Sequence, residues 1–180
     1  MINILPNVDV TTHYYEGDDL AGLSAGQIFT SSDGRRYKLC KLDTALAGTT
    51  TAAGQPLVYK TDGVTVTNDV SEGVDNTNPV VAGVVEGVFA QSAGASGSDL
   101  KLIYVLIEGP YATVATTSAG DITAGMMVRC DGSNDGQVLK FVPTAGNSGE
   151  IKASMNSILG WATADDTADD TVAVWVKPRT

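Results

Sequence analysis

The residues that could carry chemistry in this chain are few, and they do not form a recognisable catalytic set. The single histidine, His13, lies next to two tyrosines in a polar stretch, and the sequence has no Gly-x-Ser-x-Gly nucleophile elbow. A hydrolase needs a nucleophile and a base within hydrogen-bonding reach of each other. An isolated histidine is more often a surface or packing residue. We therefore predict that the chain is not an enzyme and uses no cofactor.

An acidic turn offers the best match to a metal-binding motif. Residues 131–136, Asp-Gly-Ser-Asn-Asp-Gly, resemble the start of a calcium-binding EF-hand loop. The position that should carry a bidentate glutamate is Val142, and no flanking helices are expected. A hairpin turn is the better interpretation, and we predict no metal site. Four more aspartates could gather a cation weakly or form a solvated loop: Asp165, Asp166, Asp169 and Asp170.

Two further pairs of residues could interact. Cys40 and Cys130 are too few for a disulfide framework and lack the spacing of metal ligands. They could be two reduced, packed thiols or could form a single bridge, and the sequence leaves both possibilities open. Glu86 and Glu108 could pair as carboxylates on neighbouring strands, although any β protein can offer such a pair.

The charge balance argues against a polyanionic partner. The 180 residues include 21 acidic and 11 basic side chains, so the net charge is −10. Nucleic-acid binding needs clustered basic residues, and here only Arg35 and Arg36 stand together. Residues 102–107, the longest apolar run, are too few to span a membrane, and the N-terminus lacks a secretory signal pattern. We expect neither nucleic acid nor a membrane as a partner.

Short apolar runs bounded by Gly, Asp and Asn predict β-strands joined by tight turns. We expect an all-β fold, a barrel or sandwich with little helix. It should contain two related hairpin-rich units at about residues 52–108 and 121–176, with a partial third copy at residues 25–40. A repeated supersecondary unit is most easily explained if the units pack around one core.

The two units share landmarks that occur in the same order. Their recurrence favours a true repeat over a chance similarity of composition. Four correspondences are expected: Gly54 with Gly125, Asp62-Gly63 with Asp131-Gly132, Gly83 with Gly160, and Tyr104-Val105 with Val174-Trp175.

Several strands can be placed from their side-chain pattern. In residues 171–176, three valines share one face while Ala173 and Trp175 share the other. Because both faces are apolar, this strand should be central in its sheet or covered on both sides. Residues 80–89 and 102–107 have the same character. A hairpin is expected at residues 27–42, a further strand at residues 111–117, and a short helix could occupy residues 145–155.

Residues 1–23 differ from the rest of the chain, because they show no sustained periodicity. We predict an extended N-terminal arm here, followed by a β-rich domain at residues 24–180. Four apolar residues of the arm are candidates for contacts with a partner: Ile4, Leu5, Tyr14 and Tyr15. An edge strand folded onto its own domain is an equally weighted alternative.

The order of turns and strands resembles that of a known protein family. The relevant segments are Ala124-Gly-Met-Met-Val, Asp131-Gly, Val138-Leu-Lys-Phe-Val, Leu159-Gly-Trp-Ala-Thr-Ala-Asp and Thr171-Val-Ala-Val-Trp-Val. With Gly83-Val-Val-Glu-Gly-Val-Phe, they resemble the capsid decoration, or cement, proteins of tailed bacteriophages. The resemblance covers about residues 52–176. The arm and the partial third unit are additional.

This resemblance implies a structural virion protein. Such a protein binds the outside of an assembled capsid and clamps adjacent subunits of the major capsid protein, often as a homotrimer. It would be made in the host cytoplasm and end on the capsid surface. A tail, fibre or baseplate component is the alternative, and stable oligomers without any capsid would favour it.

Overall fold

A computed structural model describes residues 3–16, 22–75, 78–96, 99–117, 122–142, 155–166 and 171–178. These ranges hold eleven strands and a short 3-10 helix: β1 (Tyr14–Tyr15), β2 (Ile28–Thr30), β3 (Arg36–Leu42), β4 (Pro56–Tyr59), β5 (Thr65–Thr67), η1 (Val70–Glu72), β6 (Val81–Val85), β7 (Leu102–Ala115), β8 (Met127–Cys130), β9 (Val138–Lys140), β10 (Ile158–Ala162) and β11 (Thr171–Val176). No helix in these ranges reaches seven residues. The all-β prediction is confirmed. The helix expected at 145–155 lies almost entirely outside the described residues.

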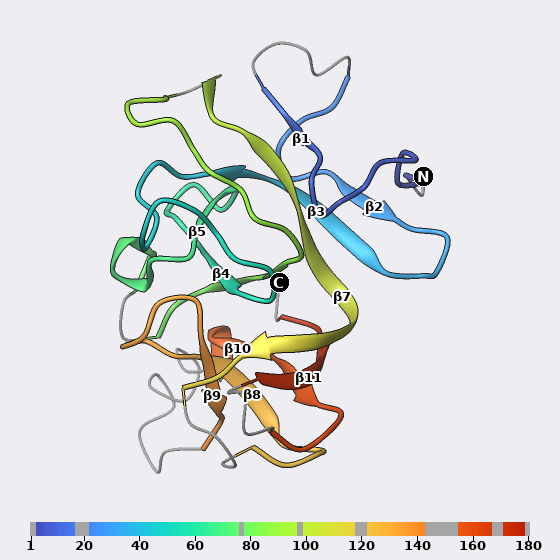
Figure 1. The fold of residues 1–180 in the computed structure, drawn as a ribbon, viewed down its shortest axis with the longest axis vertical. Helices are drawn as coiled ribbons and strands as arrows, with labels where there is room; N and C mark the ends of the chain where they lie inside the picture. Colours follow the sequence, from blue (N-terminus) through green and yellow to red (C-terminus); the bar gives the residue numbers. More distant parts are fainter. Residues whose placement is uncertain are drawn as a thin grey trace.

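Five strands close into a barrel, drawn in blue to yellow-green in the upper part of Figure 1. Their order is β3-β5-β4-β6-β7, and β7 pairs back with β3. β3 and β5 are parallel, whereas the other pairs are antiparallel. We call this closed sheet the first barrel.

The C-terminal strands have the same order of pairing as the first barrel, with the second half of β7 in the place of β3. That half pairs with β11, which is followed by β10, β8 and β9. A parallel bridge between Thr116 and Val138 then brings β9 back to the end of β7, as β5 meets β3 in the first barrel. We call these strands the second ring, which lies below the first barrel in Figure 1.

Glycines occupy matching positions in the first barrel and the second ring. Gly54 and Gly125 both have a φ of 87°, and each precedes a strand, β4 or β8. Gly83 and Gly160 each lie at a register shift between paired strands. A Cβ added at these two positions would come within 2.2 and 2.0 Å of a backbone oxygen on the next strand. Glycine is therefore needed where the two strands approach this closely.

One predicted correspondence between the closing strands is wrong by one residue. Counted from Gly83 and Gly160, the strand pairings match Val105-Leu106 to Val174-Trp175. The order of landmarks in the sequence predicts Tyr104-Val105 instead. The error moves each side chain to the opposite face of its strand, so it changes which residues are expected to be buried.

A second correspondence is wrong in the hairpin turns. The glycines with positive φ are Gly63 and Gly136, so the counterpart of Asp62-Gly63 is Asp135-Gly136 rather than Asp131-Gly132. The turn between β8 and β9 is longer than the turn between β4 and β5. The longer turn contains two Asp-Gly pairs, and only the glycine of the later pair has a positive φ.

β7 is the element that joins the two halves of the molecule. The sequence predicted separate strands at residues 102–107 and 111–117, and this was wrong, because β7 is continuous over 14 residues. Gly109 has a φ of 137° and precedes Pro110, at the place where β7 leaves β3 and begins to pair with β11. Figure 1 shows β7 bending there as it passes from the first barrel to the second ring.

Alternation along the strands divides the core into two clusters. Ile103 and Val105 of β7 pack with residues from all other strands of the first barrel, which identifies its interior. Tyr104 and Leu106 point the other way, into a second cluster that also contains inward residues of the second ring, such as Val174. No helix among the described residues is long and apolar enough to span a membrane.

The described N-terminal residues, 3–16, lie against the first barrel. β1 pairs with β7, and Ile4 forms a parallel bridge with Thr30 of β2. Val10 is buried between these two attachments. Of the two alternatives for this segment, the structure has the one in which it folds onto its own domain. The hairpin predicted at residues 27–42 is confirmed by the antiparallel pairing of β2 with β3.

Candidate interaction surfaces

Two of the four predicted contact residues of the N-terminal segment point inward. The Tyr15 hydroxyl lies 3.0 Å from the Tyr104 hydroxyl, and Leu5 and Tyr15 both pack against the core cluster. The ring of His13 meets Tyr15 edge-on, with 4.7 Å between centroids. Leu5 and Tyr15 therefore hold the segment on the first barrel.

The other two predicted residues point outward. The exposed fraction is 78% for Ile4 and 40% for Tyr14. The Lys101 ammonium lies 4.3 Å from the centre of the Tyr14 ring, and the Phe89 ring meets that ring edge-on. The Tyr14 ring is thus oriented by its neighbours while one side of it remains in contact with solvent.

A second exposed apolar surface lies on the second ring. Trp161 of β10 and Trp175 of β11 are cross-strand partners, and their rings stack with centroids 6.2 Å apart and an angle of 13° between planes. Met127 of β8 is the next partner across the sheet. These side chains are 41%, 36% and 44% exposed, in the order Trp161, Trp175 and Met127. We call them the tryptophan row.

The tryptophan row was not identified from the sequence. β11 is central in its sheet, as predicted, and its three valines point into the core, but the face that carries Trp175 is not covered. The indication available in the sequence was that two tryptophans lie in the last two strands predicted for the unit at residues 121–176. Their stacking depends on strand register, which single-sequence patterns do not determine.

Charged residues flank the tryptophan row. Glu108 accepts hydrogen bonds from Arg36 Nη1 at 2.8 Å and Lys177 Nζ at 3.2 Å. The hydrogen bonds to Arg36 and then to Lys177 lower the pKa of Glu108. Arg129 follows Met127 by two residues on the same strand and therefore shares its face. The row is therefore flanked by positive charge at both ends, because two cations share one carboxylate next to β11 and Arg129 lies on β8.

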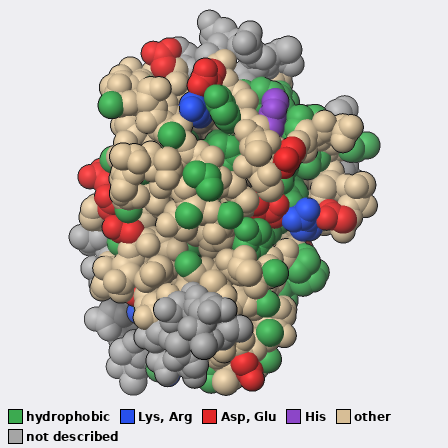
Figure 2. Space-filling view, in the orientation of Figure 1, with side chains coloured by type: hydrophobic (Ala, Val, Ile, Leu, Met, Phe, Trp, Pro, Cys, Tyr) green, Lys and Arg blue, Asp and Glu red, His purple; other side chains and the backbone are tan. Residues whose placement is uncertain are grey.

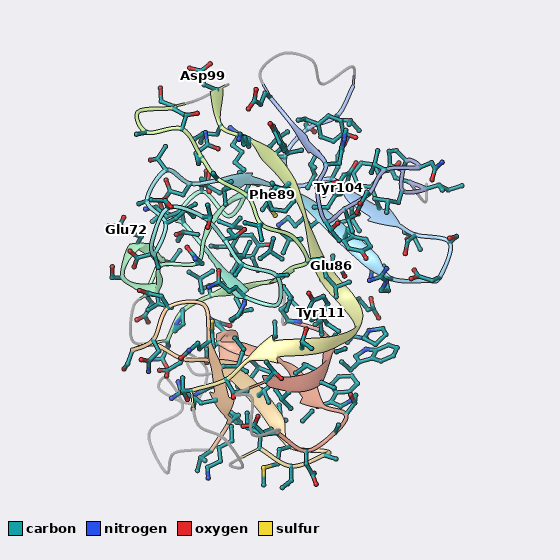
Figure 3. All side chains as sticks on the ribbon, in the orientation of Figure 1. Glu72, Glu86, Phe89, Asp99, Tyr104 and Tyr111 are labelled. Atoms are coloured by element: carbon teal, nitrogen blue, oxygen red, sulfur yellow. The ribbon has the colours of Figure 1, made fainter. Side chains whose placement is uncertain are left out.

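Glu86 has different partners from Glu108, so the possible pairing of the two carboxylates does not occur. Its Oε1 atom lies 2.7 Å from Arg35 Nη1 and accepts a hydrogen bond from the Tyr37 hydroxyl at 3.2 Å. Figure 3 shows Glu86 and Tyr111 close to the bend of β7. The only adjacent pair of basic residues, Arg35 and Arg36, is thus engaged by carboxylates.

The aspartates of the acidic loops accept hydrogen bonds within their own turn and from other segments of the chain. Asp131 Oδ1 accepts from the Ser133 N–H at 2.9 Å, and Asp135 Oδ1 accepts from the Val70 N–H at 2.8 Å. The hairpin-turn interpretation of residues 131–136 is confirmed, because these residues join the antiparallel strands β8 and β9. Asp165 accepts from the Ala124 N–H and Asp166 from the Thr116 hydroxyl. Asp169 and Asp170 lie outside the described residues. Within the described part of the chain, no group of three or more His, Cys, Asp or Glu residues could hold a metal ion.

Both cysteines are free thiols in buried positions, so the alternative of a single bridge is wrong. Cys40 belongs to the interior of the first barrel, and Cys130 belongs to the cluster that includes the second ring. Burial raises the pKa of each thiol to about 12. At neutral pH both are protonated, so neither is activated as a nucleophile.

The chain was compared with protein-family models and with curated proteins, and neither comparison gave a match. The exposed residues of the N-terminal segment and the tryptophan row are therefore the features from which a function is inferred. Both surfaces present apolar side chains on a β scaffold, which is typical of sites that bind another macromolecule by contact area.

Proposed function

We propose that this chain is a structural virion protein, not an enzyme, that binds the outside of an assembled phage capsid and stabilises it by clamping adjacent subunits of the major capsid protein. The observation that carries the proposal is the outward orientation of Ile4 and Tyr14 on the N-terminal segment. Exposed apolar side chains favour binding to a partner, because binding removes them from water. The sequence resemblance to decoration proteins supports the same function.

A protein that stabilises a capsid in this way depends more on a large contact area and many bound copies than on strong individual contacts. Binding energy comes from a few well-packed apolar and aromatic anchors, and the rest of the interface supplies complementarity. Leu5 and Tyr15 order the segment before docking, which reduces the entropy that binding would otherwise cost. Linked copies on one shell then gain avidity without new contacts.

The test is co-sedimentation of the full-length protein with undecorated shells of the parent phage. We expect saturable binding by the natural protein, and binding weakened by about tenfold or more in Ile4→Asp and Tyr14→Ser, because each variant loses an exposed anchor. Val142→Asp is the matched control, since Val142 is 61% exposed at a distant position after β9. This control should bind as the natural protein does.

Two outcomes would contradict the proposal. Absence of binding by the natural protein, together with a stable oligomer in solution, would favour a tail, fibre or baseplate component. Equal losses in all three variants would show that the effect is not specific to the N-terminal segment. Circular dichroism of each variant would show whether the β fold is retained.

A further inference from the structure

We propose that the tryptophan row is an interface between copies of this chain, and that it receives the acidic edge around η1 of a second copy. The acidic edge is defined by Asp69, Glu72 and Val74. This inference concerns self-association, so it does not depend on what the assembled protein binds.

The internal repeat indicates that the tryptophan row occupies a position that this fold normally covers. Val84 and Leu106 are cross-strand partners in the first barrel, and Trp161 and Trp175 are the corresponding pair in the second ring. Val84 directly follows the bulge glycine Gly83, just as Trp161 directly follows the bulge glycine Gly160. Val84 and Leu106 are completely buried, in a cluster that includes Val10 of the N-terminal segment. The corresponding pair in the second ring is left uncovered within one copy.

The residue types of the tryptophan row are those found at the centre of protein–protein interfaces. Trp and Met are enriched where proteins meet, and tryptophans are frequent among the residues that dominate binding energy. The stack also offers a flat, rigid surface, because the two rings are nearly parallel. Large aromatic side chains that already hold each other in place lose little conformational freedom on binding.

Charge complementarity identifies the surface that fits the row. Arg36 and Lys177 share Glu108, and Arg129 adds a further positive charge beside Met127. The acidic edge offers the opposite sign: Asp69 caps η1, and Glu72 is exposed although it contacts Lys60. Val74, which is 47% exposed, supplies an apolar contact between acidic residues.

The two surfaces lie on opposite sides of the molecule. Figure 2 shows hydrophobic side chains gathered along the right-hand edge, over the region where Figure 1 places β11 and the bend of β7. Acidic side chains follow the left-hand edge of Figure 2, on the side where Figure 3 labels Glu72. Opposite, non-identical surfaces produce head-to-tail association, in which the row of one copy meets the acidic edge of the next.

The chain provides its own reporter for this contact. It contains two tryptophans, and both belong to the row. If copies associate as proposed, raising the protein concentration should shift the tryptophan emission to shorter wavelengths and protect it from acrylamide, in step with the increase in mass measured by sedimentation velocity. A monomer at all concentrations, with solvent-exposed tryptophans, would overturn the proposal. A shift that appears only when capsid shells are added would also overturn it.

Complementary variants test which surfaces meet. Trp175→Asp disables the row, and Val74→Lys disables the acidic edge, so each variant alone should associate about tenfold or more weakly than the natural protein. Mixed together, they should form a heterodimer, because the intact row of Val74→Lys can bind the intact edge of Trp175→Asp. The control Val88→Asp, at a residue exposed elsewhere, should associate normally. No heterodimer in the mixture, or association unaffected by either variant, would overturn the proposed contact.

Discussion

Glu86 is a buried carboxylate at the junction between the first barrel and the second ring. Its partners are Arg35 and the Tyr37 hydroxyl, and the Arg35 side chain passes over Gly109, where an added Cβ would lie 2.7 Å from Arg35 Cγ. The ion pair thus lies across the bend of β7. Burial raises the pKa of Glu86 above its ordinary value of 4.5, although Arg35 and Tyr37 act in the opposite direction.

This pKa shift predicts a defined pH dependence of stability. The folded protein holds the Glu86 proton more tightly than the unfolded chain does, so the stabilisation is present below pH 4.5 and is lost as pH rises through the folded-state pKa. Relative to Glu86→Gln, which does not titrate there, the free energy of unfolding of the natural protein should therefore fall across this window. Urea unfolding at a series of pH values measures the difference.

Glu108 supplies a control with the opposite sign. Its pKa is lowered from 4.5 by Arg36 and Lys177, so its contribution is present above pH 4.5 and is lost as pH falls through the folded-state pKa. Relative to Glu108→Gln, the natural protein should lose stability on acidification. If both differences followed pH in the same direction, the environments assigned to the two carboxylates would be wrong.

At the scale of elements, the equivalent turns before β4 and β8 allow two effects of replacing a glycine to be measured separately. These effects are backbone strain at positive φ and steric clash of the added Cβ. Gly54 and Gly125 share a φ of 87°, but a Cβ at Gly54 would lie 2.1 Å from the Thr113 carbonyl oxygen, whereas a Cβ at Gly125 meets nothing within 4 Å. Gly125→Ala should cost about 1 kcal/mol, from backbone strain alone. Gly54→Ala should cost about 3 kcal/mol or more, because the strand must also move.

Denaturant unfolding of the two variants measures these free energies. Gly34→Ala is a further control, since Gly34 also has positive φ and open space around the added Cβ. It should resemble Gly125→Ala. Equal losses at Gly54 and Gly125 would mean that the contact with Thr113 relaxes at no cost, which would contradict the close packing of the turn before β4 against β7.

The elements that were predictable from the sequence are those whose signals are local. The hairpin of β2 and β3 follows from Asp33-Gly34, because Gly34 supplies the positive φ that the turn requires. The continuity of β7 was not predictable, since Gly109-Pro110 resembles a strand break. It persists because β7 changes partners there, from β3 to β11.

The same distinction applies to the candidate surfaces. Apolar residues in the N-terminal segment were evident, and alternation explains why Tyr15 points inward while Tyr14 points outward. The tryptophan row depends on pairing between strands that are separate in the sequence. A shift of one residue in the register of β10 against β11 would have placed one tryptophan on the other face.

At the scale of the whole molecule, the two halves share both a strand and a core. β7 contributes its first half to the first barrel and its second half to the second ring. One hydrophobic cluster contains Tyr104 of the first barrel together with Val174 of the second ring. Unfolding either half would remove a neighbour of β7 and expose part of this cluster, so neither half should be stable without the other.

We therefore predict a single cooperative unfolding transition, which probes in the two halves can test. Tryptophan fluorescence reports on the second ring, because both tryptophans belong to β10 and β11. In a Cys130→Ala variant, thiol labelling reports on Cys40 in the interior of the first barrel. The two probes should give the same denaturant midpoint, as expected for a two-state domain. If fluorescence changed while Cys40 stayed protected, the second ring would unfold separately, and β7 would be a connection between two domains rather than part of one.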